Sequence, residues 1–461
     1  MTTNMSPTGH SRAILTLGLP LIGGHLGQMA IGVTDTVMAG WYSVEALAAV
    51  TLASTYFFVL FIFGSGFAWA IMPMVATFVA EEDEVAIRRA TRMGLWLSIG
   101  FALVALPFLI FAEPILRTLG QGDALAAEAA RYLTIAGWGI FPALLVMVLK
   151  SYLAALERTQ VVLWITLVAA VANAMANYAF IFGNWGAAEM GVAGAALASV
   201  FTHTVSLIGV TVYILVVVPQ HQLFVRFWRA DGQMLARVFR LGWPISLTSL
   251  SEVGLFAASA MMMGWLGTIP LAAHGIAVQL ASITFMVHLG LSNVATIRAG
   301  NAFGRHDSAH MARGAGTVTL MSIGFALVTI LIFVSFPQPL ISAFMQENEP
   351  ARAEIMEIGV GLLVMAALFQ LVDGTQAVAL GLLRGVQDTA IPMWMAAFSY
   401  WVVGVPCSYL LGFVWGWEGI GVWAGLVIGL GIAAVLLNTR FWAFVLPAVG
   451  AVRPARTTLP L

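Results

Sequence analysis

The chain has 461 residues, of which 61% are hydrophobic and only 9% are charged. An ordinary soluble domain carries about 25% charged residues, so a soluble core could not hide this much apolar surface. The net charge of −1 provides no basic surface, and we expect no nucleic-acid partner. The single cysteine excludes a disulfide framework and a cysteine-based metal site. The composition therefore predicts an all-α protein embedded in a membrane.

Long apolar runs divide the chain into twelve candidate membrane-spanning helices, because one span needs about 20 apolar residues. Charged residues, glycines and prolines mark the ends of these runs. The predicted spans are 13–40, 47–79, 93–112, 132–155, 160–182, 190–218, 238–265, 271–302, 314–336, 354–383, 390–414 and 419–447. The polar start leads directly into the first run without a cleavage site, so we interpret it as a mature N-terminus and not a signal peptide.

The basic residues indicate how the chain is oriented. With twelve spans, all of the 20 Lys and Arg residues except Arg117, Arg131 and Arg352 fall on the side that both termini share. Short loops rich in Lys and Arg stay in the cytoplasm. We therefore predict a multi-pass protein of the bacterial inner membrane with both termini cytoplasmic. A missed span would scramble this bias, so the bias also supports the helix number.

The two halves of the sequence resemble each other. An alignment without gaps pairs Leu17 with Leu241, Gly66 with Gly290 and Asp83 with Asp307. Each repeat holds six spans, an even number, so the repeats run parallel through the membrane. We predict two six-helix lobes, 1–218 (N-lobe) and 238–461 (C-lobe), joined by a basic amphipathic linker over 219–237 at the cytoplasmic surface. This plan is typical of secondary transporters, although gene duplication also builds channels.

Three acidic residues lie well inside predicted spans, where a carboxylate is costly and usually functional. Glu252 and Asp373 lie roughly 18 and 16 Å from the predicted cytoplasmic face, by the helical rise per residue. Asp35 lies roughly 9 Å from the outer end of the first span. The repeat copies none of the three, so we interpret them as specialisations of the separate lobes.

Polar residues at similar depths are candidate partners of these acids. Asn173 and Asn177 are four residues apart and share a helix face. Together with Ser199 they form the expected polar network around Asp35. Gln370 lies close in sequence to the second-lobe acids. The sequence therefore predicts two polar sites, one in each lobe.

Such acids have three possible roles: to carry a proton, to bind Na⁺ or to hold a cationic substrate. We consider a Na⁺ site at Glu252 and Asp373, with Na⁺ or H⁺ as the coupling ion. The sequence contains no phosphate-binding loop and no catalytic motif, so we expect no other cofactor and no enzyme activity. Phe369, one turn before Asp373, is a candidate cation–π surface of a substrate cavity. Further cavity candidates are Gln370 and, in the eighth span, Gln279 and Phe285.

Several segments together carry a resemblance to a known family over residues 13–447. They include LGLPLIGGHLGQMAIGVTDTVMAG, LGWPISLTSLSEVGLF, ATIRAGNAFG and FQLVDGTQAVALGLLRGVQDT. The chain resembles the multidrug and toxic compound extrusion (MATE) family, in its NorM-like branch. That family exports cationic amphipathic drugs across the lipid bilayer in exchange for Na⁺ or H⁺, which implies the same activity here, by alternating access of two lobes.

The resemblance also implies roles for individual residues. Glu252 and Asp373 match the second-lobe cation-site acids of the family. Asp35, Asn173 and Asn177 match its first-lobe polar network, with a serine at 199 where threonine is common. The eighth span departs from the pattern, because it lacks the tyrosine that some members place beside the cation, which leaves the identity of the ion open.

We therefore expect a monomeric multidrug efflux antiporter for cationic amphipathic molecules. One alternative is a flippase for a lipid or polysaccharide precursor. A flippase for a phosphorylated lipid should line its cavity with arginine, whereas the basic residues here lie almost wholly at the predicted cytoplasmic ends. A channel or receptor is a second alternative, and passive conductance would support it.

Overall fold

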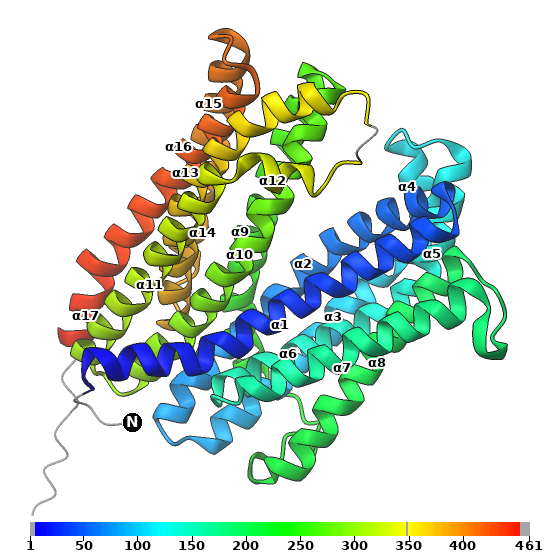
Figure 1. Ribbon diagram of the computed structural model, residues 1–461. Helices are drawn as coiled ribbons and strands as arrows, with labels where there is room; N and C mark the ends of the chain where they lie inside the picture. Colours follow the sequence, from blue (N-terminus) through cyan, green and yellow to red (C-terminus); the bar gives the residue numbers. More distant parts are fainter. Residues whose placement is uncertain (1–4, 347–348, 452–461) are drawn as a thin grey trace, which may run out of the picture. The chain divides into compact units, whose positions relative to one another are not determined.

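The computed structural model describes residues 5–346 and 349–451, and the regular elements within these ranges are all helical (Figure 1). Twelve helical segments in the described part of the chain are long and apolar enough to cross a membrane. The predicted all-α fold with twelve membrane spans is confirmed. Several helices extend beyond their predicted bounds, because polar residues at the ends of the apolar runs continue the helix.

The described residues of the first half, from residue 5 onward, form eight α-helices. They are α1 (Pro7–Tyr42), α2 (Val44–Ala80), α3 (Glu84–Ile110), α4 (Ala112–Thr118), α5 (Asp123–Ala136), α6 (Ile140–Ala155), α7 (Thr159–Phe182) and α8 (Val192–Val217). A short 3₁₀ turn, η1 (Gly137–Gly139), joins α5 to α6 within one span.

The second half of the chain contains the remaining helices. They are α9 (Gly232–Leu266), α10 (Thr268–Gly304), α11 (Ser308–Ser335), α12 (Pro337–Ser342), α13 (Arg352–Gly385), α14 (Ala390–Ala397), α15 (Val405–Tyr409), α16 (Glu418–Thr439) and α17 (Leu446–Ala451). The last two spans contain π-helical turns, η4 (Phe398–Gly404), η5 (Leu410–Val414) and η6 (Arg440–Val445). A π turn rotates the residues that follow it relative to an α-helix, and such turns are frequent at functional sites.

The residues form two compact units. We call Gly23–Ser246 the N-unit, and the chain up to Ile22 together with the chain from Leu247 onward the C-unit. The predicted lobes follow the sequence repeat, whereas the contacts assign the first half of α1 to the C-unit and the first half of α9 to the N-unit. Ile22 and Ser246 are equivalent positions in the repeat. In each lobe, the first half of the first helix therefore belongs to the other unit, and we call these two segments the exchanged helix halves.

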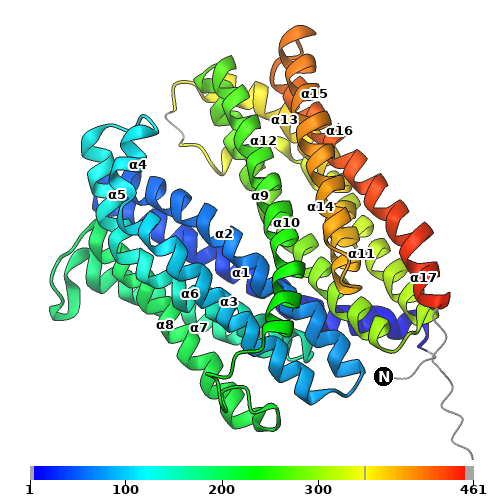
Figure 2. The same ribbon diagram turned by 180° about the vertical axis from the view of Figure 1, so that it is seen from behind.

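Two glycines that the repeat copies explain how these helix halves pack. In the C-unit, a Cβ atom on Gly290 of α10 would lie 3.1 Å from the backbone nitrogen of Ile22 on α1. In the N-unit, a Cβ atom on Gly66 of α2 would lie 2.6 Å from the backbone nitrogen of Ser246 on α9. Only glycine permits helix backbones to approach this closely. Figure 2 shows the course of α9.

Polar contacts also fasten the exchanged half of α1 within the C-unit. The Arg298 Nη2 atom on α10 donates a hydrogen bond of 2.8 Å to His10 Nδ1 on α1 and lies 3.3 Å from His310 Nε2 on α11. The side chains of all three residues are buried. In the N-unit, the Ser246 hydroxyl of α9 donates to the Phe63 carbonyl on α2 at 2.5 Å.

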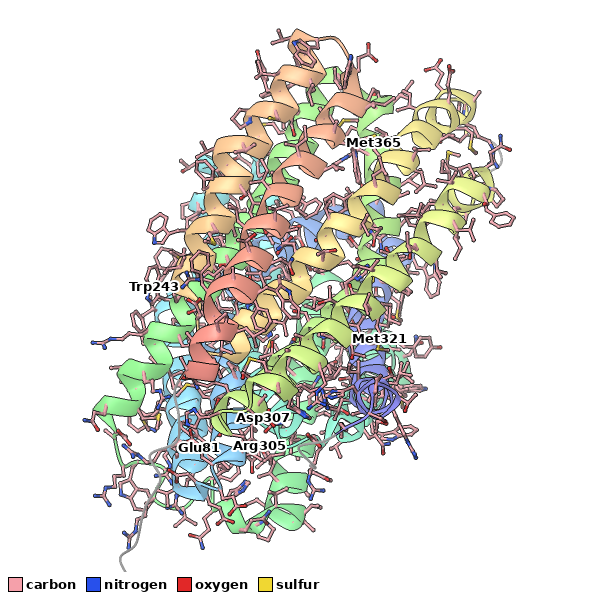
Figure 3. The ribbon with its side chains drawn as sticks, turned by 90° about the vertical axis from the view of Figure 1, so that its left-hand side faces the viewer. Glu81, Trp243, Arg305, Asp307, Met321 and Met365 are labelled. Atoms are coloured by element: carbon pink, nitrogen blue, oxygen red, sulfur yellow. The ribbon has the colours of Figure 1, made fainter. Side chains whose placement is uncertain are left out.

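The aligned aspartates cap equivalent helices. Asp83 Oδ1 accepts a hydrogen bond of 2.8 Å from the Ala86 nitrogen at the start of α3. Asp307 Oδ1 accepts one of 2.9 Å from the His310 nitrogen at the start of α11. Figure 3 labels Asp307 at the turn that precedes α11. N-cap carboxylates satisfy amides that the first helical turn leaves unpaired, so the duplication has preserved a structural role.

The predicted linker is fastened to α3 within the N-unit. The Arg92 Nη2 atom donates to the Val225 carbonyl at 2.5 Å, and the Trp96 indole donates to the Phe227 carbonyl at 3.0 Å. Arg89 forms an ion pair of 2.5 Å with Asp231. The hydrogen bond from Arg89 holds the pKa of the Asp231 carboxyl below its usual value. Residues 232–237 of the predicted linker belong to α9.

Candidate functional site

The two faces of α7 differ sharply, and this difference positions the site of the N-unit. Trp164, Val168 and Val171 are 64%, 58% and 61% exposed, at the spacing of one helix face. Asn173 and Asn177 lie on another face and are both fully buried, at 0% exposure. An apolar face is compatible with lipid, while buried amides need polar partners. The amides of α7 therefore face into the unit.

Asp35 on α1 is the partner of both amides. Asn173 Nδ2 donates a hydrogen bond of 2.9 Å to Asp35 Oδ1, and Asn177 Nδ2 donates one of 2.6 Å to the same oxygen. Asn177 Nδ2 also lies 3.3 Å from Asn173 Oδ1. The four-residue spacing on α7 thus presents two donors to one carboxylate. The structure brings these three sequence-predicted residues together.

Two hydroxyl groups complete this site. Ser199 on α8 lies beside the Asp35 carboxylate, and its hydroxyl donates to the Ala195 carbonyl at 3.1 Å. The Tyr132 hydroxyl on α5 shares a hydrogen bond of 3.3 Å with the Ser199 hydroxyl. Ser199 was predicted from the sequence. Tyr132 was missed, because it stands at the predicted start of its span, where a tyrosine usually serves as an interfacial anchor.

This arrangement suits a cation or a proton. The groups that hydrogen-bond to Asp35 are neutral, and none of the ion pairs in the described part of the chain includes this carboxylate. Within the same part, the buried Asn177 Oδ1 atom has no hydrogen-bond partner. A carboxylate and an adjacent amide oxygen are hard ligands of the kind that alkali and alkaline-earth cations prefer.

The C-unit brings together the other two acids. Asp373 on α13 is 2% exposed, and its Oδ1 atom has no hydrogen-bond partner among the residues that the structure describes. Glu252 lies on the second half of α9, is half-buried, and interacts electrostatically with Asp373 and with Arg384. Two acids in one buried region repel each other unless a proton or a cation lies between them.

Neutral polar groups surround this acidic pair. Gln370 Nε2 donates to the Ala281 carbonyl at 3.3 Å, while its Oε1 atom has no partner in the described ranges. Tyr400, on η4, is fully buried and interacts electrostatically with both acids. No three His, Cys, Asp or Glu side chains in the described residues are placed to hold a metal ion. A cation here would therefore also need amide or hydroxyl oxygens.

Tyr400 and Arg384 were missed by sequence reasoning. The eighth span lacks the tyrosine that some family members have there, whereas Tyr400 of the eleventh span interacts electrostatically with both acids. The π-helical turn around Tyr400 hides this from a count of helical periods, because it shifts the face on which a residue lies. Arg384 was interpreted as a basic residue at a helix end, which gave no indication of its interaction with Glu252.

The predicted cavity residues lie in different surroundings. Phe369 is 1% exposed, and its ring centroid lies 5.7 Å from those of Phe256 and Trp423 in edge-to-face contacts. Its ring is thus part of an aromatic core. Phe285 and Gln279 on α10 are half-buried. Their contact with a substrate stays a prediction.

Comparison with known proteins identifies the family. The MatE family model matches residues 20–179 and 244–410, more than half of the chain. The chain belongs to this family. A probable multidrug resistance protein NorM of Rhizobium meliloti strain 1021 is 46% identical over 444 residues, covering 95% of this chain and 94% of the relative. The corresponding protein of Agrobacterium fabrum strain C58 is 45% identical, covering 94% and 93%.

Solved structures of MATE proteins share the fold. A structure described as the outward-facing conformation of a multidrug resistance MATE family transporter has a TM-score of 0.86 at 19% identity, covering 97% of both chains. A MATE structure in the bent conformation also has a TM-score of 0.86 at 19% identity, covering 96% of this chain and 97% of the other. The predicted family is confirmed. The relatives are named as resistance proteins and transporters, a non-enzymatic class, as predicted.

Proposed function

We propose that this MATE protein exports cationic amphipathic compounds in exchange for Na⁺ or H⁺. The names of its relatives, which are multidrug resistance proteins, support a drug-like cargo. The distribution of basic residues supports a location in the bacterial inner membrane with both termini cytoplasmic. We further propose that the protein acts as a monomer, because the residues of the Asp35 site all come from helices of one unit.

The observation that carries the proposal is the Asp35 site. Two neutral amides position this carboxylate, and none of the described ion pairs balances its charge. An intramembrane carboxylate without a cationic partner favours a proton, a metal cation or an organic cation as its ligand. The acidic pair in the C-unit offers a second place for such a ligand.

Transport of the drug is coupled to transport of the ion if the two ligands favour different conformations or compete for one carboxylate. A ligand shifts a conformational equilibrium only by the difference in its affinity for the two states. Binding of the ion would then displace the drug and change the state that faces each side. The outward-facing and bent conformations of the structural relatives support an alternating-access cycle in this fold.

Dye efflux from proteoliposomes tests the proposal. Purified protein is reconstituted, ethidium is loaded, and a Na⁺ gradient, a proton gradient or no gradient is imposed. Wild type is compared with Asp35→Asn, Glu252→Gln and Asp373→Asn. Glu113→Gln serves as a matched control, because Glu113 is an exposed acid of the N-unit that pairs with Arg117 at 2.6 Å.

We expect one gradient to drive efflux in wild type and in the control, and the three acid variants to lose it. That gradient identifies the coupling ion. Dye movement that no gradient changes would indicate a channel and contradict exchange. If neither gradient moves ethidium, the antiporter proposal fails, and flipping of a fluorescent lipid precursor becomes the next measurement.

A further inference from the structure

A second polar cluster lies in the N-unit, apart from Asp35. The Lys150 Nζ atom on α6 donates a hydrogen bond of 2.8 Å to the Thr166 hydroxyl on α7. Lys150 is the one lysine of the chain. His25 on the second half of α1 and His203 on α8 both lie within electrostatic reach of it. Four helices of one unit therefore contribute to a cluster of basic side chains inside the membrane spans.

Lys150 has no acidic partner among the residues that the structure describes. None of the ion pairs formed by the described residues involves Lys150. The Thr166 hydroxyl is buried and donates to the Val162 carbonyl at 2.8 Å, so it offers the amine only a neutral acceptor. A basic side chain within a membrane span is costly and usually pairs with another group. An anionic group from outside the protein would give Lys150 the partner that the described residues do not provide.

The cluster and the Asp35 site both contain residues of α7 and α8. On α7, Thr166 precedes Asn173 by seven residues, which is about two turns, so both point the same way at roughly 10 Å separation. On α8, Ser199 precedes His203 by four residues, which is about one turn or roughly 6 Å. The N-unit thus presents a carboxylate and a basic cluster in line, at a spacing that one drug-sized molecule can span.

We propose that Lys150, with His25 and His203, forms an anion-binding subsite for amphoteric substrates. The cationic part of such a molecule binds at Asp35, and its carboxylate binds at Lys150. The lysine donates charge-assisted hydrogen bonds to the carboxylate, which are stronger than its bond to the neutral Thr166 hydroxyl. This inference rests on the proposed export function and makes the basic cluster a determinant of substrate specificity.

A matched pair of dyes tests the subsite. Rhodamine 110 carries a free carboxylic acid, and rhodamine 123 is its methyl ester, so the two share one cationic ring system and differ in the anionic group. Efflux of each dye from proteoliposomes is measured for wild type, Lys150→Met and Lys150→Arg. Arg117→Gln is the control, because it also removes a positive charge from the N-unit, at an exposed ion pair with Glu113.

We expect Lys150→Met to raise KM for rhodamine 110 about tenfold, the effect of losing one charge-assisted hydrogen bond, and to change KM for rhodamine 123 less than about twofold. Lys150→Arg should retain most of the acid selectivity, and the control should behave as wild type. If Lys150→Met does not insert stably, His203→Gln provides the same comparison with a smaller expected shift.

The outcomes separate this inference from the proposed function. If Lys150→Met and His203→Gln affect both dyes equally or affect neither, the subsite is overturned, and pairing of Lys150 with a lipid phosphate explains an equal effect. If the gradient moves neither dye through wild type although ethidium efflux succeeds, the subsite is likewise overturned. Failure of ethidium efflux as well would contradict the export function itself.

Discussion

The polar sites of the two units differ in how completely their groups are hydrogen-bonded. In the N-unit, Asp35 already accepts hydrogen bonds of 2.9 and 2.6 Å from two amides. In the C-unit, Asp373 Oδ1 and Gln370 Oε1 are buried and have no partner in the described part of the chain. A buried polar atom without a partner costs about 1–3 kcal/mol. These C-unit residues carry two such atoms, whereas the amides around Asp35 carry one, Asn177 Oδ1, so the C-unit gains more from a bound ligand. The N-unit site is pre-organised, whereas the C-unit site is incomplete without an ion or proton.

The repeat separates shared structure from individual function. The copied residues, such as Gly66 with Gly290 and Asp83 with Asp307, pack helices or cap them. The site acids have no copies. Asp35 aligns with Ser259, whose hydroxyl donates to the Phe256 carbonyl at 2.8 Å within its own helix. The duplication thus provided two similar scaffolds, and each acquired its own acidic residues: one in the N-unit and two in the C-unit.

Apart from replacing one of the acids, the largest expected effect comes from removing a donor of the pre-organised site. Asn177→Ala deletes the 2.6 Å hydrogen bond to Asp35, and bonds to charged groups contribute about 1.5–3 kcal/mol. We expect the apparent affinity for the coupling ion to change at least about tenfold. The direction of the change in affinity identifies the ion. If the site binds Na⁺ with help from the amide, its affinity for Na⁺ falls. If it binds a proton, its affinity rises, because a carboxylate that has lost a hydrogen-bond donor holds a proton more tightly. The affinity is read from the ion dependence of ethidium efflux.

Two further variants compare the effect of removing an amide in the C-unit with the effect of Asn177→Ala in the N-unit. Gln370→Ala removes an amide that, among the described residues, donates to the Ala281 carbonyl alone, so we expect a smaller change, about threefold or less. Asn438→Ala is the control, since its amide donates to the Ala434 carbonyl of its own helix. Equal effects of Asn177→Ala and Gln370→Ala would contradict the contrast between a pre-organised and an incomplete site.

The next prediction concerns the exchanged helix halves. Gly66→Ala would place a Cβ atom 2.6 Å from the Ser246 nitrogen and 2.7 Å from the Gly242 carbonyl oxygen, both backbone atoms. At Gly290 the nearest backbone atom is 3.1 Å away, and the closest contact is a side-chain atom, Ile22 Cγ1. Overpacking costs about 1–3 kcal/mol. We therefore expect both variants to lower the thermal unfolding temperature in detergent, and Gly66→Ala to lower it more.

Gly100→Ala serves as the control for this pair. A Cβ atom at Gly100 of α3 would meet no atom within 4 Å. Alanine is favoured over glycine in a helix interior by about 0.8–1.0 kcal/mol, so this variant should unfold at the wild-type temperature or slightly above it. A loss of stability in Gly290→Ala that exceeds the loss in Gly66→Ala would show that the side-chain contact, not the backbone contact, limits packing.

The sequence was sufficient for the twelve spans, the repeat and the partners of Asp35, because hydropathy and a four-residue spacing are properties of single segments. The exchange of helix halves could not be predicted in this way. It depends on which helices pack against each other in the folded protein. Gly66 and Gly290 indicated only that another helix backbone approaches closely at these positions, not which helix. Tyr400 was missed because a π-helical turn breaks the helical period that sequence reasoning assumes.

The smallest expected effect tests whether the copied caps are equivalent. Asp83→Ala and Asp307→Ala each remove a hydrogen bond of 2.8 or 2.9 Å to the first turn of a helix. Loss of an N-cap costs about 1 kcal/mol, so both variants should be destabilised by a similar amount in thermal unfolding, with ethidium efflux unchanged. Asp123→Ala is the control, because Asp123 lies inside the first turn of α5 and the cap position there is Gly122. If one cap variant abolishes efflux while the other only lowers stability, the copied aspartates have diverged in function. That aspartate would then have a functional role of its own, and the rule that copied residues serve structure while uncopied acids serve transport would not hold at its position.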